Sequence, residues 1–328
     1  MAQTTSSTMS SHMQTELLST SAMRPLFSKS GIFRALINQS NIDGAPSQVR
    51  KIRKLSTGTV AAADTEGAQI TTFDTLSVGT AISLTPTGYY SAVQLTIESI
   101  QRVMPGATYD ACIAAVMSGD PRVLPLVQAA VDQINDNIQR KLETLALAQL
   151  ASASETAGTT NTALAFSYML AGLANVLDNN LANEQLCFVL EEKGLADLRA
   201  ALISGSGASL SAIWGNSAAD VSLFNMLPDV SRNGFRGSFL GMPVYAADKN
   251  LMTTANAGVD RVGAVMAIGQ GPAEVGMRGA LEICYGHDLK LGFDYRPDYN
   301  VLNIFGRVRA VVGEHTDEHY SQIIYKKD

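Results

Sequence analysis

The spacing of apolar residues from Leu124 to Ala151 predicts one long amphipathic helix. Valine, isoleucine and leucine recur at intervals of three and four, which places them on one helical face. That apolar face contains Val127, Val131, Ile134, Ile138, Leu142 and Leu145. The opposite polar face contains Asp132, Asn135, Asp136, Gln139, Arg140 and Glu143. Pro125 suits the first helical turn, where its missing N–H is not needed. A helix of roughly 40 Å is expected to brace a broad sheet.

Before this helix, Ala68 to Ile100 has the pattern of a β-hairpin. The segment is rich in Thr, Ile, Val and Tyr, and residues 92–97 alternate as in a strand. We place the tip at residues 79–88, GTAISLTPTG. No Lys or Arg occurs between Leu55 and Gln101, so the charges that usually protect an exposed strand edge are missing. Such a hairpin is better suited to lying across a neighbouring subunit than to facing solvent.

After the long helix, the pattern predicts two helices and then a return to strands. The helices are expected at residues 163–177 and 194–203. Strands are expected at residues 185–190, 262–268, 280–285, 301–313 and 319–325, with a glycine-cornered strand pair at 234–248. This order indicates an α+β fold whose final strands pair back near the long helix.

The amino-acid composition argues against some classes of function and favours others. Of the 328 residues only 16% are charged, against ~25% in a typical soluble protein, which suggests an exterior covered by partners. The net charge of −6 argues against a dedicated nucleic-acid reader. The cysteines at 112, 187 and 284 lack metal spacing and are expected to be buried, reduced thiols of a cytosolic protein. No segment reaches ~18 uninterrupted apolar residues, so no membrane span is predicted.

The first part of the chain is polar and then locally basic. Residues 1–21 have the composition of a disordered segment. The basic residues that follow are Arg24, Lys29, Arg34, Arg50, Lys51, Arg53 and Lys54. The segment is either a solvated linker or an arm that lies on a neighbouring subunit, and we favour the arm.

The candidates for chemistry are weak, so no catalytic, cofactor-binding or metal-binding residue is predicted. His315 and His319 within Glu314–His319 have zinc-like spacing, but no third ligand is evident and a solvated turn fits better. The glycine pairs at 205–207 and 269–271 lack the lysine of a phosphate-binding loop and are predicted to be flexible loops. His287 is predicted in a turn. Three further aromatic residues are assigned to packing or an interface edge: Trp214, Tyr89 and Tyr90.

Taken in order, these segments resemble the major capsid proteins of tailed bacteriophages, whose fold is shared by encapsulin shell proteins. Glu66-Gly67 is similar to the start of the family's extended loop, and SAVQLTIESI to the strand that returns from it. Residues 124–151 resemble the spine helix. CFVLEEKGLADLRAAL resembles a central strand–turn–helix, LGMPVYAAD the G-x-P-V strand of the axial domain, and FGRVRAVVG the strand that closes the peripheral sheet. The resemblance covers the chain from Leu55 onward.

The resemblance implies a division of the chain into four parts. They are an N-terminal arm (1–60), an extended β-hairpin loop (61–98), a peripheral domain (99–160 and 290–328, with spine helix 124–151) and an axial domain (161–289).

It also implies a function. The protein would be made in the host bacterial cytoplasm and would assemble into the icosahedral shell of the virion around a double-stranded DNA genome. The expected partners are other copies in pentamers and hexamers, a separate scaffolding protein, the portal, a decoration protein and non-specifically held DNA, with no membrane. Because the loop has no lysine, maturation is expected to be non-covalent.

Two alternatives remain open. An encapsulin-type compartment would use the same fold, but the long polar and basic leader argues against it. A cytosolic enzyme or small-molecule binder is disfavoured by the low charge and the absence of site motifs.

Overall fold

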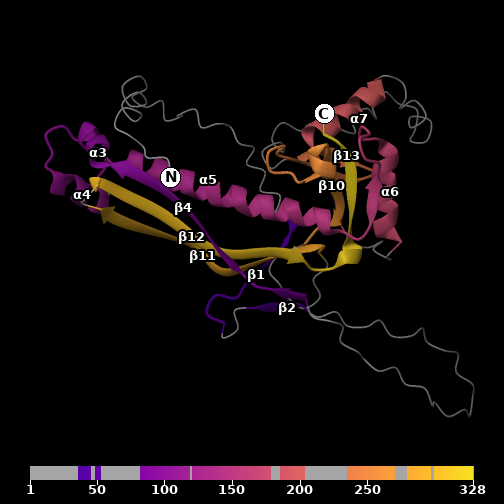
Figure 1. Ribbon diagram of the computed structural model, residues 1–328, viewed down its shortest axis with the longest axis horizontal. Helices are drawn as coiled ribbons and strands as arrows, with labels where there is room; N and C mark the ends of the chain where they lie inside the picture. Colours follow the sequence, from indigo (N-terminus) through magenta and orange to yellow (C-terminus); the bar gives the residue numbers. More distant parts are fainter. Residues whose placement is uncertain are drawn as a thin grey trace, which may run out of the picture.

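The computed structural model describes residues 36–45, 49–52, 82–118, 120–178, 185–203, 235–269, 279–296 and 299–327. A long helix, α5, runs along a four-stranded sheet and ends against a seven-stranded one (Figure 1). A third sheet in the described residues has two strands. The predicted α+β class is confirmed.

Helix α5, Leu124–Gln149, confirms the predicted spine helix, and a 3-10 turn at Leu150–Ser152 follows it. Its buried stripe consists of Leu126, Ala130, Ile134, Ile138, Leu142, Ala146 and Leu147. Val127, Val131 and Leu145 flank this stripe and are half-buried. Glu143, predicted on the polar face, is only 3% exposed. The polar assignment was wrong at this position, because the folded chain buries this turn of α5 on more than its apolar face. Four residues further on, the Thr253 hydroxyl donates to the Leu147 carbonyl at 3.3 Å.

A four-stranded sheet packs against α5. Its strands, in spatial order, are β1 (Asn38–Asn41), β11 (Leu281–Arg296), β12 (Val301–Glu314) and β4 (Thr87–Thr96). β11, β12 and β4 are antiparallel neighbours, and β1 runs parallel to β11. Gly306 on β12 lets the helix approach, since a Cβ there would lie 2.6 Å from Cγ2 of Ile134. The prediction that a late strand pairs back near the long helix is confirmed for β12, which β4, from before the helix, joins on one side.

The predicted hairpin needs correction. β4 ends at Thr96 because the Thr96 hydroxyl accepts the N–H of Ser99 at 3.3 Å and caps helix α3, Ile97–Val103. β3 (Ile82–Leu84) pairs with β2 (Arg50–Ile52), and not with β4. The expected tip at residues 79–88 therefore includes the start of β4, and the segment that joins β2 to β3 is 53–81, outside the described residues.

The second sheet has seven strands in the described residues. In order they are β5 (Thr156–Gly158), β13 (Tyr320–Lys326), β10 (Asp260–Ala267), β6 (Leu186–Glu191), β8 (Met242–Ala247) and β7 (Phe235–Phe239), while β9 (Thr254–Ala255) pairs with β10. One face packs against α6 (Phe166–Leu177) and α7 (Glu192–Ile203). The predicted strand pair at 234–248 is confirmed as β7 and β8, which turn at Leu240 and Gly241 with φ of 53° and 79°.

The last strand is placed differently from the prediction. β13 pairs with β10 and β5, and does not extend the sheet beneath α5. Its alternating buried residues face the α6 side, where Gly172 leaves room for the Ile323 side chain. β11 is also a single strand of the α5 sheet from Leu281 onward, so sheet membership does not change at residue 290.

The remaining helix, α4, covers Tyr109–Ser118. Several predictions fall outside the described residues: most of the basic leader, Gly205–Gly207, Trp214 and the pair Gln270-Gly271. Among the helices of the described residues, none combines the length and the hydropathy of a membrane-spanning segment.

Candidate assembly surfaces

A fully buried carboxylate, Glu282 on β11, joins several distant segments. Ser40 Oγ on β1 donates to Glu282 Oε1 at 2.5 Å, and Arg50 Nε on β2 donates to the same oxygen at 3.3 Å. His315 Nε2 lies 4.0 Å from Glu282 Oε2. The backbone N–H of His315 also donates to the carbonyl of Ala280 at 2.8 Å. One side chain thus holds β1, β2, β11 and the turn after β12 together.

A small apolar cluster fixes the same region. Ile52 of β2 and Leu84 of β3 pack on Cys284 of β11, and all three are buried. Gly313 on β12 leaves room for the Leu84 side chain, since a Cβ there would lie 2.2 Å from its Cδ2 atom. Burial raises the pKa of the Cys284 thiol, which keeps it protonated. Both ends of the segment 53–81 are therefore anchored on the α5 sheet.

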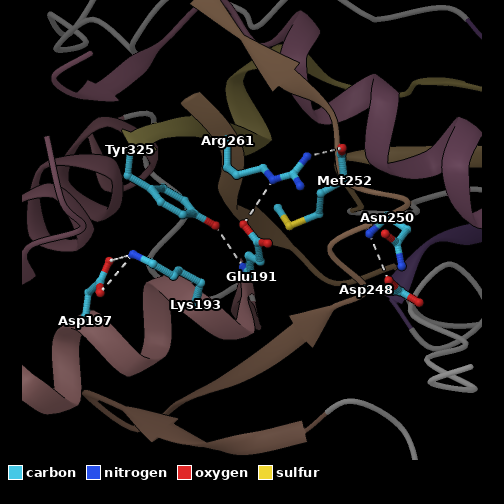
Figure 2. Close-up of polar contacts among 8 residues, drawn as sticks. All are labelled: Glu191, Lys193, Asp197, Asp248, Asn250, Met252, Arg261 and Tyr325. Atoms are coloured by element: carbon cyan, nitrogen blue, oxygen red, sulfur yellow. Dashed lines mark hydrogen bonds and ion pairs between the residues drawn. The ribbon is translucent and has the colours of Figure 1, made fainter. Parts of the chain in front are cut away.

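The seven-stranded sheet contains a buried ion pair (Figure 2). Arg261 Nε on β10 lies 3.1 Å from Glu191 Oε2 on β6, and Arg261 Nη1 donates to the Met252 carbonyl at 3.2 Å. The Tyr325 hydroxyl on β13 accepts the backbone N–H of Glu191 at 2.8 Å. Burial raises the pKa of the Glu191 carboxyl, and the Arg261 charge opposes that rise. These contacts tie three strands to the turn before β9.

Figure 2 also shows two polar contacts nearer the surface. Lys193 and Asp197 form an ion pair at 3.0 Å one helical turn apart on α7. Asp248 accepts the N–H of Asn250 at 2.8 Å in the turn after β8. Because these groups are partly solvated, we expect them to contribute far less than Glu191 and Arg261.

The α5 sheet carries a hollow of about 380 Å³ beside β4. It is lined by Gly88, Tyr89, Tyr90, His287, Arg307, Val308 and Arg309. Tyr90 is 71% exposed, whereas the Tyr89 ring packs beneath Lys141 of α5, with Nζ 5.6 Å from the ring centroid. Arg307 lies over the Phe305 ring at 5.1 Å. The sheet therefore exposes aromatic and cationic groups on the side away from α5.

The histidines and cysteines considered as metal ligands have packing or turn positions in the described part of the chain. Residues 315–319 form the predicted turn, where Asp317 accepts the N–H of Ser154 at 3.0 Å. No group of three or more His, Cys, Asp or Glu that could hold a metal occurs in the described residues. His287 lies in β11 at a β-bulge, and not in a turn as predicted. The three cysteines are buried and unbridged, as predicted.

Comparison with known proteins identifies the fold. No protein-family model matches the sequence, and no curated protein does so either. Solved structures do match. The head structure of Helicobacter pylori bacteriophage KHP40 has a TM-score of 0.61 and 9% identity, over 93% of this chain and 92% of that chain. The chain has the phage capsid fold.

Other capsids agree with this assignment. The capsid of a native GTA particle gives a TM-score of 0.58 at 11% identity, covering 92% of both chains. The capsid of Ralstonia phage GP4 gives 0.56 at 11% identity, over 92% of this chain and 89% of that chain. Because the capsid fold extends over nearly the whole length of each chain, the predicted resemblance is confirmed at the level of fold.

Sequence reasoning did not find the buried charges Glu282, Glu191 and Arg261. A signal for Glu282 was present, since it interrupts the apolar strand ALEICY. A charge within such a run requires a buried partner, but Arg50 and His315 lie too far along the chain to be assigned from spacing.

Proposed function

We propose that this protein is the major capsid protein of a tailed phage, the subunit of an icosahedral shell that encloses double-stranded DNA. The similarity to capsid subunits across more than nine-tenths of the chain carries the proposal. The residues anchoring segment 53–81 support it, because a segment held firmly at both ends is suited to contact a neighbouring subunit.

Such a subunit would act through the arrangement of its contacts with neighbouring subunits. The α5 sheet would form the peripheral domain and the seven-stranded sheet the axial domain. Segment 53–81 would lie over one neighbour, and the residues before Leu36 would clasp another. Copies would associate as pentamers and hexamers, and many modest contacts would add up through multivalency.

The further partners follow from the same proposal. A separate scaffolding protein, a portal and a decoration protein would complete the particle, which would assemble in the bacterial cytoplasm. DNA would be held without sequence preference, since the net charge of −6 leaves only local basic groups for phosphate contacts. The subunit would act as a structural protein and not as an enzyme.

Electron microscopy of the expressed protein, with and without a co-expressed scaffold, tests the proposal. We expect closed shells that contain DNA or scaffold. Shells that contain an enzyme would instead support an encapsulin-type compartment. A persistent small soluble oligomer under both conditions would contradict the shell function.

A further inference from the structure

The outer edge of β11 is unpaired over half of its length in the described residues. β1 pairs with β11 only from Glu282 to Tyr285, and the last backbone contact on that side is Ile42 N–H to Tyr285 O at 2.8 Å. Beyond it, Lys290 to Arg296 pair with β12 on the inner side alone. Figure 1 shows β1 beside only one end of β11. Exposed strand edges normally pair or are protected, because their backbone groups can template another strand.

This free edge carries apolar side chains of unusual exposure. Leu291 and Phe293 are each 45% exposed. They lie on the α5 side of the sheet, because Leu291 pairs with Gly306, whose missing Cβ points at α5. Lys290, Asp294 and Arg296 lie on the opposite side and are also exposed, and Arg296 Nε donates to Asp294 Oδ2 at 3.2 Å within the same strand. The edge therefore presents one apolar and one charged row.

The two rows are self-complementary about Gly292. If a second copy ran antiparallel with Gly292 opposite Gly292, Lys290 would face Asp294 of the other copy, and Asp294 would face its Lys290. On the other side of the sheet, Leu291 would face Phe293 and Phe293 would face Leu291. Opposite charges and apolar pairs directly across antiparallel strands stabilise a sheet. A register shifted by one residue would place apolar side chains against charged ones.

We propose that the β11 edges of two subunits pair across a two-fold axis at Gly292, which joins two α5 sheets into one eight-stranded sheet. The inference deepens the proposed function, on which it rests, by assigning a contact between subunits. The bulges between Tyr285 and Lys290 end the regular register, so the ladder spans about five residues on each copy. One such contact is too small for a stable isolated dimer, but a closed shell repeats it many times.

Cysteine cross-linking tests the register. Directly opposed residues have Cα atoms ~4.5–5.5 Å apart, which is within disulfide range. Leu291→Cys and Phe293→Cys are made in separate full-length chains, which are co-expressed, assembled and then oxidised. We expect a cross-linked dimer when both variants are present and little when either is alone. The native cysteines add little background, because all three are buried.

Charge reversal tests the contacts independently. Lys290→Asp and Asp294→Lys each create two like-charge pairs per contact, so we expect each to reduce assembled particles by about tenfold or more at low salt. The double variant Lys290→Asp/Asp294→Lys restores both cross-strand pairs and loses only the exposed Asp294–Arg296 pair, so it should recover most of the assembly. Lys193→Asp, an exposed reversal on α7, should leave the yield unchanged. Failure of the double variant to recover would contradict the proposed register.

The two hypotheses fail in distinguishable ways. Closed shells without the mixed cross-link would overturn the β11 pairing and leave the shell function intact. Mixed cross-links in a species that never forms shells would retain the pairing and overturn the shell function. Equal cross-linking of Leu291→Cys alone would show that the edge binds some other segment or register.

Discussion

At the scale of single residues, buried charges determine how distant segments meet. Glu282 joins β2 to the α5 sheet, and Glu191 with Arg261 joins the strands of the second sheet. Each carboxylate loses its hydration on burial, so its protein partners must replace the water. Such groups have large effects when one partner is removed, and much smaller effects when both are replaced.

Glu191→Leu should therefore lower the free energy of unfolding by about 3–5 kcal/mol, because Arg261 would remain buried without its carboxylate. The double variant Glu191→Leu/Arg261→Met should lose clearly less. Urea unfolding of unassembled subunits measures both. Lys193→Ala, which removes only the exposed pair with Asp197, should change the value by less than about 0.5 kcal/mol. Equal losses in the single and double variants would show that the ion pair is not the cause.

The sequence could not identify Glu191 and Arg261 as partners. Lys193 and Asp197 lie four residues apart, a spacing that can be recognised directly. Glu191 and Arg261 are brought together only by the pairing of β6 with β10. Glu143 shows the same limitation, since the folded chain buries it although the helical period places it on the polar face.

At the scale of elements, the spacing of apolar residues predicted those helices and strands that depend on neighbouring residues in the sequence. The 3.6-residue period predicted α5, and the continuous apolar run predicted β6. Strand partners are not encoded locally, so residues 82–84 were placed in the tip of the predicted hairpin, whereas they form β3 and pair with β2. β13 was assigned to the wrong sheet for the same reason.

Ile138→Asp tests the placement of α5. Ile138 is buried against the sheet, and its side chain would lie 3.3 Å from a Cβ at Gly306. An unpaired carboxylate at this position should abolish folding and leave only insoluble protein. Gln133→Asp, on the exposed side of the same helix, should give normal soluble subunits. Recovery of soluble, folded Ile138→Asp subunits with native circular dichroism would show that this helix face is not in the core.

At the scale of the whole molecule, the fold could be predicted and the assembly could not. The order and spacing of the segments, from the strand before the spine helix to the late strands, were sufficient to indicate a capsid fold. The contact proposed at the β11 edge was not predicted from the sequence, because the exposure of that edge is a property of the folded chain.

Assembled shells should dissociate completely when boiled in detergent. Segment 53–81 contains lysine only at position 54, before Leu55, so the extended part of the loop has no amine for an isopeptide bond. Gel electrophoresis without reducing agent should show one band near the monomer mass of 34.8 kDa. A ladder of higher bands would mean that the subunits are covalently joined.

The packing around α5 has a thermodynamic consequence. One hydrophobic cluster includes Ile134 and Leu147 of α5, Ile304 of the first sheet, and Met266 and Tyr320 of the second. Neither sheet can lose its packing without exposing apolar surface that belongs to the other. An unassembled subunit should therefore melt in one cooperative transition, with equal calorimetric and van't Hoff enthalpies. The two sheets with their helices are then two regions of one folding unit, and a calorimetric trace with two separate peaks would contradict this.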